Sequence, residues 1–161
     1  GPHAADDAGV PRGPDAAELH ILPTLWFRND WSEWIAESNR TNKKPIIKQI
    51  KAQENVSAAE VSHSLLGDFI LSCEGDVPLL FTENETNHEK LFPGTKNESP
   101  HVKDGINDYV IHKAQDAVNP DKQGTKAAAH FRLTIGAGKT SVVSLRITKK
   151  DSNSKSKKKS C

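Results

Sequence analysis

Cysteine, net charge and long apolar runs are all scarce in this sequence, and each scarcity excludes a class of protein. The 161 residues contain two cysteines, too few for the disulfide framework of a small secreted domain. A formal net charge of +1 at pH 7 provides no overall field to attract nucleic acid, so no nucleic-acid partner is expected. No stretch approaches the roughly 18 apolar residues of a transmembrane helix, and no signal peptide is recognisable. No membrane span is therefore expected, and the compartment is left open with a preference for the cytoplasm.

The length suits one domain with two tails. Residues 1–17 are rich in Ala, Gly, Pro and Asp and are expected to form a flexible leader. Its first three residues, Gly-Pro-His, resemble the scar that a protease leaves after removal of an affinity tag. Residues 18–149 are expected to form the folded domain, and the Lys/Ser-rich residues 150–161 a disordered tail.

Short β-compatible segments between turn residues predict an all-β fold, an antiparallel β-sandwich with at most one short helix. The expected strands are Leu19–Phe27 (interrupted by a proline), Pro45–Lys51, Gly67–Cys73, Val77–Thr82, Ala127–Ile135 and Thr140–Lys149. Two turns, at residues 74–76 and 136–138, contain glycine and predict that the strands on either side of each pair as a hairpin. Apolar residues at helical spacing place the helix within Val102–His112, and polar residues make Glu83–Pro100 a long loop.

Gly138-Lys139-Thr140 matches the end of a phosphate-binding Walker A motif. A complete motif has a further glycine where this chain has Leu133, and it must follow a strand and open a helix. The residues after Thr140 alternate in a β-rich pattern instead. A hairpin turn is therefore preferred over a nucleotide site, and no cofactor is expected.

Histidine and cysteine do not form a metal-binding pattern. Six of the histidines are scattered without an H-x-x-x-H or H-E-x-x-H spacing: His20, His63, His88, His101, His112 and His130. Cys73 lies in an apolar run and is expected in the core, whereas the terminal Cys161 is expected to be an exposed thiol. No metal site is therefore expected.

Four longer motifs carry a family resemblance. They are LHILPTLWFRNDW (Leu19–Trp31), GDFILSCEGDVPLLFTENETN (Gly67–Asn87), SPHVKDGINDYVIH (Ser99–His112) and DAVNPDKQGTKAAAHFRLTIGAG (Asp116–Gly138). In this order they resemble the N-terminal region of bacterial-type glucosidases related to glycoside hydrolase family 63, the mannosyl-oligosaccharide glucosidase-like enzymes. The resemblance extends over nearly all of Pro14–Thr148.

The resemblance implies an N-terminal β-supersandwich domain that precedes a larger (α/α)₆ barrel, with the acidic catalytic pair in the barrel. No segment of this chain corresponds to the barrel, and the match begins partway through the sandwich domain. The expectation is therefore a truncated or stand-alone module without catalytic activity of its own, which supports or contributes to carbohydrate processing. In a full-length enzyme the barrel would be its partner domain.

Glu83 and Glu85 are a candidate acid pair for glycoside hydrolysis, which needs a pair of carboxyl groups flanking the scissile bond. The surrounding sequence puts them at a strand end, where carboxylates are normally solvated. The resemblance also implies that the catalytic acids lie elsewhere. No catalytic residue is therefore assigned.

Sugar binding without hydrolysis is an alternative, because carbohydrate sites combine aromatic faces with side chains that bond hydroxyl groups. The candidate carbohydrate-binding residues are Trp31, Trp34, Asn84, Glu85 and Asn87. Trp31 and Trp34 fit an exposed site and packing against a partner domain equally well, whereas Trp26 beside Phe27 is typical of a core. Asparagines in such loops also often bond the local backbone. A further alternative is self-association or partner binding through exposed strand edges.

Overall fold

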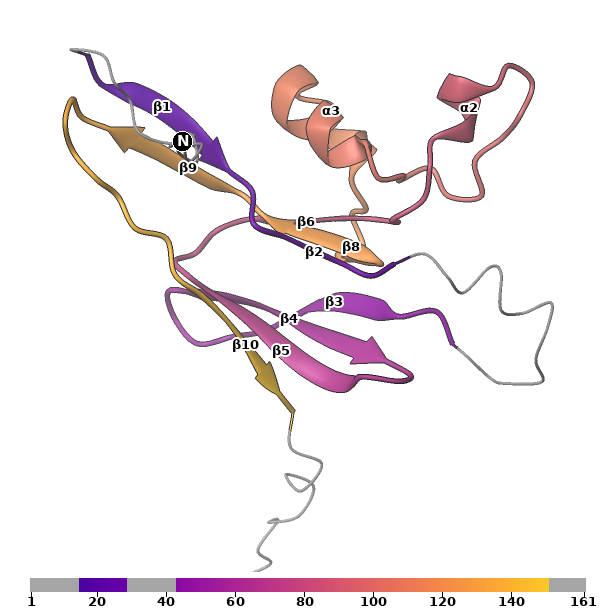
Figure 1. Cartoon of the computed structure of the whole chain (residues 1–161), viewed down its shortest axis with the longest axis horizontal. Coiled ribbons are helices and arrows are strands. Elements are labelled where there is room, and N and C mark those ends of the chain that lie inside the picture. Colours follow the sequence, from indigo (N-terminus) through magenta and orange to yellow (C-terminus); the bar gives the residue numbers. More distant parts are fainter. Residues whose placement is uncertain (1–14, 29–42, 151–161) are drawn as a thin grey trace, which may run out of the picture.

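The computed structural model describes residues 15–28 and 43–150, which form a two-layered antiparallel β-sandwich (Figure 1). In chain order the strands are β1 (Ala17–Ile21), β2 (Thr24–Trp26), β3 (Ile46–Ile50), β4 (Val56–His63), β5 (Gly67–Glu74), β6 (Leu79–Thr82), β7 (Gln123–Gly124), β8 (Lys126–Ala129), β9 (Phe131–Ile135) and β10 (Leu145–Lys149). The helical elements are α2 (His88–Leu91), α3 (Gly105–His112) and the 3₁₀ turn η1 (Gln115–Ala117). The predicted all-β sandwich is confirmed, although the four-residue helix α2 adds a second helix within the predicted loop Glu83–Pro100. Within these ranges no helix has the length and apolar character needed to cross a membrane.

Each layer of the sandwich has its own strand order. One layer is the five-stranded sheet β10-β5-β4-β3-β7. The other contains β2-β8-β6 and continues into the β1-β9 pair, because β1 leads into β2 and β8 leads into β9 (Figure 1). Pro23 separates β1 from β2 as predicted, since proline has no N–H to donate to a ladder. Its carbonyl still accepts a hydrogen bond from the N–H of Ala129 at 3.0 Å.

The main core lies between the two layers. The five-stranded sheet contributes Ile47, Ala59, Val61, Leu71 and Cys73, and the opposite layer contributes Leu79, Phe81, Ala127, Ala129 and Phe131. Cys73 is fully buried, as predicted, and burial raises the pKa of its thiol. A thiol in this environment is unreactive and contributes only to the packing of the core.

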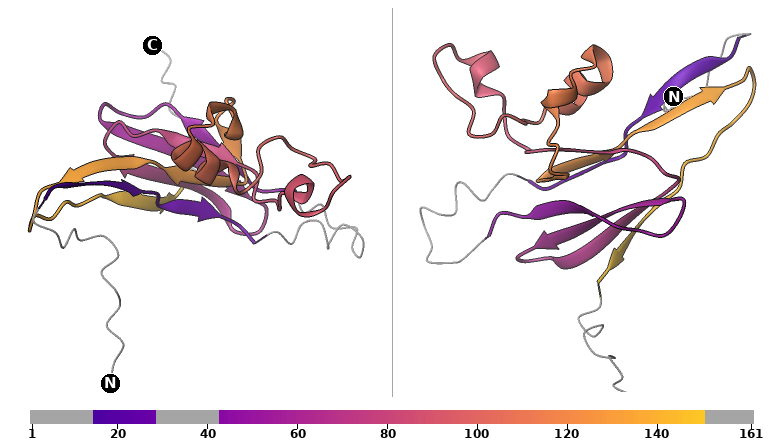
Figure 2. Two further views of the ribbon diagram at one scale, coloured as in Figure 1. Left: turned by 90° about the horizontal axis from the view of Figure 1, so that it is seen from above. Right: turned by 180° about the vertical axis from the view of Figure 1, so that it is seen from behind.

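A second apolar cluster lies on the outer side of the β2-β8-β6 sheet. Helix α3, predicted within Val102–His112, covers this face (Figures 1 and 2). The buried members of the cluster are Leu80, Ile106, Val118 and Ala128. Because side chains alternate across a strand, β6 sends Phe81 into the main core and Leu80 toward the helix. All four residues of β6 are consequently buried.

The predicted hairpin of Gly67–Cys73 with Val77–Thr82 is wrong. β5 pairs with β4 and β10, whereas β6 pairs with β8 in the other layer. The turn at Gly75, where φ is +97°, therefore carries the chain from one layer to the other. Ser57 holds this crossing, because its hydroxyl donates to the carbonyl of Val77 at 2.7 Å and accepts from the N–H of Val77 at 3.0 Å.

The hairpin that does form consists of β4 and β5. Its register runs from Val56 opposite Glu74 to His63 opposite Gly67. The sequence did not predict β4, because Ala58 and Ala59 are poor strand formers in isolation. Burial of both alanines makes the strand favourable in the folded protein.

The predicted hairpin of Ala127–Ile135 with Thr140–Lys149 is also wrong, although a turn forms between them. The N–H of Lys139 donates to the carbonyl of Gly136 at 3.0 Å, and Gly138 has a φ of +64°. β9 pairs with β1 and β10 pairs with β5, so this turn is a second crossing between layers. No helix begins between this turn and residue 150, where the described residues end, so the helix that a Walker A motif requires is missing there.

Thr82 is fully buried, and its hydroxyl has no hydrogen-bond partner among the described residues. We expect Thr82→Val to raise the free energy of unfolding by up to about 1 kcal/mol in urea titrations, because it removes an unsatisfied hydroxyl at constant shape. The matched control is Thr125→Val. The Thr125 hydroxyl donates to Glu83 at 2.7 Å and accepts from the N–H of Asn84 at 2.7 Å, so its loss should destabilise the protein. A destabilised Thr82→Val variant would contradict the expectation.

Candidate carbohydrate-binding site

The candidate residues Asn84, Glu85 and Asn87 follow directly after β6, at one end of the helix-covered sheet. Trp31 and Trp34 lie outside the described residues. The described residues therefore contain only the polar half of the predicted site. The structure does show how the polar half is built.

Lys44 forms a bridge between the two carboxylates of this loop. Its ammonium lies 3.0 Å from Glu83 Oε2 and 2.9 Å from Glu85 Oε1. Burial alone would lower the pKa of Lys44, but its hydrogen bonds to Glu85 and Glu83 outweigh burial and raise it. Glu83 Oε2 also accepts the Thr125 hydroxyl at 2.7 Å. Both carboxylates are thus ion-paired, and Glu83 is additionally fixed to the adjacent strand segment.

Asn84 joins the end of β6 to two neighbouring segments. Its N–H donates to Thr125 Oγ1 at 2.7 Å, and its side-chain Nδ2 donates to the carbonyl of Phe27 at 3.0 Å. The second bond ties the loop to the chain just after β2. Asn84 therefore helps to position the segment that leads into residues 29–42.

Asn87 caps helix α2 and links it to two other parts of the loop. Its Oδ1 accepts from the N–H of Lys90 at 3.2 Å and from Asn97 Nδ2 at 2.9 Å. Its Nδ2 donates to the carboxylate of Asp104, at 3.1 Å to the nearer oxygen. This is the local bonding typical of asparagine in turns and caps. The side chain thus has protein partners at both its donor and its acceptor end.

Trp26 is a residue whose position sequence reasoning misjudged. It is 55% exposed rather than in the core, and it pairs with Lys126 across the β2-β8 ladder. Lys126 Nζ in turn donates to the carbonyl of Lys103 at 2.8 Å, and Lys103 Nζ donates to Thr86 Oγ1 at 3.1 Å. Burial, and then the charge of Lys103, lowers the pKa of Lys126. The strand alternation, with Leu25 facing inward, was the signal that could have placed Trp26 outside.

A cluster of titratable side chains lies on the β1-β9 pair, away from the 83–87 loop. His20 Nδ1 and His130 Nε2 are 2.8 Å apart, and His20 Nε2 lies 3.2 Å from Glu18 Oε1. Arg132 also contacts Glu18 at 3.0 Å, and its hydrogen bond and charge lower the pKa of that carboxyl. When both imidazoles are neutral and Glu18 is ionised, His20 Nε2 carries the proton and His130 Nε2–H donates to His20 Nδ1; a charged His20 would donate from Nδ1 instead. Over the described residues, no group of three potential metal ligands occurs here or elsewhere.

We expect the protein to lose stability as the pH falls below about 6.5, the ordinary pKa of an unfolded histidine. Burial, followed by the charges of His20 and Arg132, lowers the pKa of His130 in the fold. The unfolded chain therefore binds a proton at higher pH than the folded protein, and this part of the stability is present above pH 6.5 and lost through the folded pKa. Urea titrations across this range test it. His130→Asn should weaken the pH dependence, the exposed His112→Asn should preserve it, and an unchanged slope in His130→Asn would contradict the assignment.

The fold and the loop together define an antiparallel β-sandwich domain with a polar, internally bonded loop at one end of a helix-covered sheet. No family model and no solved structure matches the sequence. The chain is similar to the uncharacterized protein YMR196W of Saccharomyces cerevisiae, with 34% identity over 163 aligned positions. The alignment covers 87% of this chain and 14% of the yeast protein, so the chain spans a small part of that relative's length.

Proposed function

We propose that this chain is a non-catalytic β-sandwich module that supports carbohydrate processing within a larger protein related to the family 63 glucosidases. The observation that carries the proposal is the bridge from Lys44 to both Glu83 and Glu85. The bridge engages Glu83 and Glu85, the candidate acid pair for hydrolysis, whereas a glycosidase's general acid must be free to protonate the leaving group. The antiparallel sandwich is also the architecture that the motif resemblance implies for a module preceding a barrel.

Hydrolysis assays test the non-catalytic part of the proposal. We expect the purified chain to release no glucose from maltose, trehalose or glucosylated oligosaccharides, and Glu83→Gln to leave that blank result unchanged. Turnover by the purified chain that disappears in Glu83→Gln would overturn the proposal. The structurally similar change Glu89→Gln, in the short helix α2, serves as the control for indirect effects.

Deletion in the yeast relative tests the supporting role. We expect YMR196W without the segment that matches this chain to show a lower midpoint of thermal unfolding, or to be insoluble. Adding this chain back as a separate polypeptide should restore part of the lost stability. A deletion variant with the unfolding midpoint and solubility of the intact protein would argue against a supporting module.

Carbohydrate binding is the second candidate function, and the exposure of Trp26 favours it. Trp26 pairs with Lys126 on the sheet whose end carries the 83–87 loop, and aromatic rings are common in ligand sites. Indole and amide NMR shifts during titration with glucose, maltose and trehalose test this candidate together with Trp31 and Trp34. Saturable shifts that Trp26→Ala or Trp34→Ala abolishes would support it, and a well-dispersed spectrum without any shift would count against it.

A further inference from the structure

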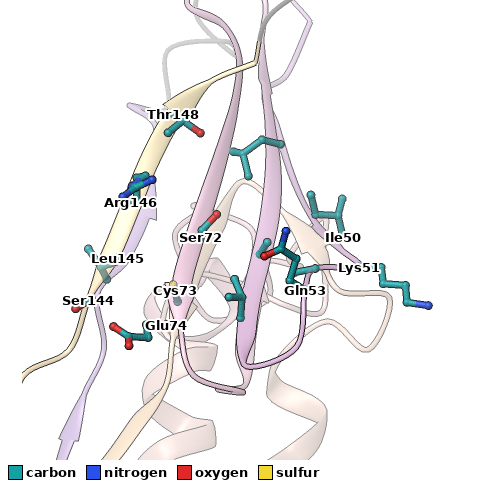
Figure 3. Close-up of a pocket in the computed structure, with 14 residues that line it drawn as sticks. Ile50, Lys51, Gln53, Ser72, Cys73, Glu74, Ser144, Leu145, Arg146 and Thr148 are labelled. Atoms are coloured by element: carbon teal, nitrogen blue, oxygen red, sulfur yellow. The ribbon is translucent and has the colours of Figure 1, made fainter. Parts of the chain in front are cut away.

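The outer face of the five-stranded sheet contains a hollow of about 600 Å³. Figure 3 shows β10 with Arg146 and Thr148 on one side of it, Ile50 on the other, and Ser72 of β5 between them. This face belongs to the layer opposite the one that carries helix α3 and the 83–87 loop (Figure 1). The hollow is therefore separate from the candidate site described above.

The strand register explains why this face is hollowed. Ile50 pairs with Ala58, Ala58 with Ser72, and Ser72 with Arg146, so these residues form one row across four strands. Their sequence neighbours Ala59 and Leu71 point into the core, which places the row on the outer face. The small side chains of Ala58 and Ser72 thus lie between the longer side chains of Ile50 and Arg146. This difference in length produces the hollow.

The floor of the hollow is aliphatic. Ala58 lines the hollow and is only 4% exposed, although it lies on the outer face of the sheet between longer side chains. Ile70 and Val56 continue the apolar lining along β5 and β4. The space has the size of a typical ligand pocket, which is about 300 to 1,000 Å³.

The polar side chains around this floor are free of protein partners. Across residues 15–28 and 43–150, no hydrogen bond or ion pair involves the side chains of Gln53, Ser72, Glu74, Arg146 or Thr148. The 83–87 loop is the opposite case, because there Lys44, Thr125 and Asp104 already engage the polar groups. Unpartnered donors and acceptors around an apolar floor are typical of a binding site rather than of a structural network.

We propose that this hollow binds a short neutral oligosaccharide. Arg146 supplies donors, Glu74 supplies acceptors, and Gln53 supplies both, so together they match the hydroxyl groups of a hexose. The aliphatic floor matches the apolar face of a sugar ring. Because Arg146 and Glu74 carry opposite charges on neighbouring strands, a strongly anionic or cationic ligand would meet a repelling group. The proposal rests on the proposed role in carbohydrate processing and adds to it a binding surface away from the loop.

The experiment is an NMR titration of the isotope-labelled chain with maltotetraose, trehalose and mannobiose. We expect saturable amide shifts at Ala58, Ser72, Glu74 and Arg146 with at least one of these sugars. Arg146→Gln should weaken that binding at least tenfold, and Ser72→Leu should abolish it by filling the hollow. The control is Arg132→Gln, an exposed arginine on β9 in the other layer, which should leave the affinity unchanged.

Three results would overturn the proposal. They are a well-dispersed spectrum without shifts, shifts confined to Trp26 and the 83–87 loop, and equal binding of glucuronate or inorganic phosphate at the hollow. None of these results would test the supporting role. The deletion experiment in the yeast relative tests that role separately, because it measures stability and does not depend on sugar binding. Failure of the hollow and failure of the proposed function are therefore distinguishable.

Discussion

Gly124→Ala is expected to lower the free energy of unfolding by about 3 kcal/mol, the upper end of the range for inserting a methyl group into a packed site. A Cβ at this position would lie 2.3 Å from the carbonyl oxygen of Thr82 and 2.9 Å from its carbonyl carbon. Backbone atoms cannot move aside as a flexible side chain can. The N–H of Thr125 also donates to that same carbonyl at 3.1 Å, so the two segments are held together where β7 crosses the end of β6.

Urea unfolding monitored by circular dichroism measures this effect. Gly136→Ala is the matched control, because there the nearest atom to the added methyl group is Cγ of the flexible Lys139, at 3.3 Å. We expect the control to change the stability by less than about 0.5 kcal/mol, as surface substitutions usually do. Equal stability of the two variants would show that the close approach of Gly124 to Thr82 does not constrain the fold.

Phe81→Ala is expected to cost about 3 to 5 kcal/mol, which removes much of the stability of a typical small domain. Phe81 is fully buried and lies in the main core between the layers. Removing its ring leaves a cavity among residues of both sheets, which pack too closely to collapse completely around it. The variant should unfold at a much lower urea concentration, or show the broadened spectrum of a partly folded protein.

Leu80→Ala tests the second apolar cluster independently of the main core, because Leu80 lies on the opposite face of β6 from its neighbour Phe81. Leu80 packs with Ile106 of helix α3, so we expect hydrogen exchange to accelerate mainly in that helix. Leu145→Ala, a partly exposed apolar position on β10, should cost less than about 1 kcal/mol. Uniform acceleration of exchange in Leu80→Ala would contradict the assignment of two separate clusters.

Several elements could be predicted because their causes are local. Alternation and β-propensity identified the strands around Pro23 and Ile47, and helical spacing identified α3. The apolar run that contains Cys73 identified this residue as part of the core, where it is fully buried. β4 was not predicted, because alanine has a low strand propensity and the strand becomes favourable only when its alanines are buried in the fold.

The candidate site was predicted less completely. Position at the end of a strand correctly indicated that residues 84–87 form a polar loop, but not that Lys44, 41 residues before Glu85, engages its carboxylates. Such a pair depends on which segments the fold brings together. The exposure of Trp26 and the row of residues under the outer hollow likewise depend on sheet position and register.

The sequence by itself determined the class of the fold, the interruption at Pro23, the position of α3 and the turns at Gly75 and Gly138. It did so because backbone conformation and side-chain alternation depend on neighbouring residues. Only the tertiary structure decided that both turns cross between layers instead of closing hairpins. A turn residue permits a change of direction, but the partner of each strand is chosen by burial of its apolar face against residues far away in the chain.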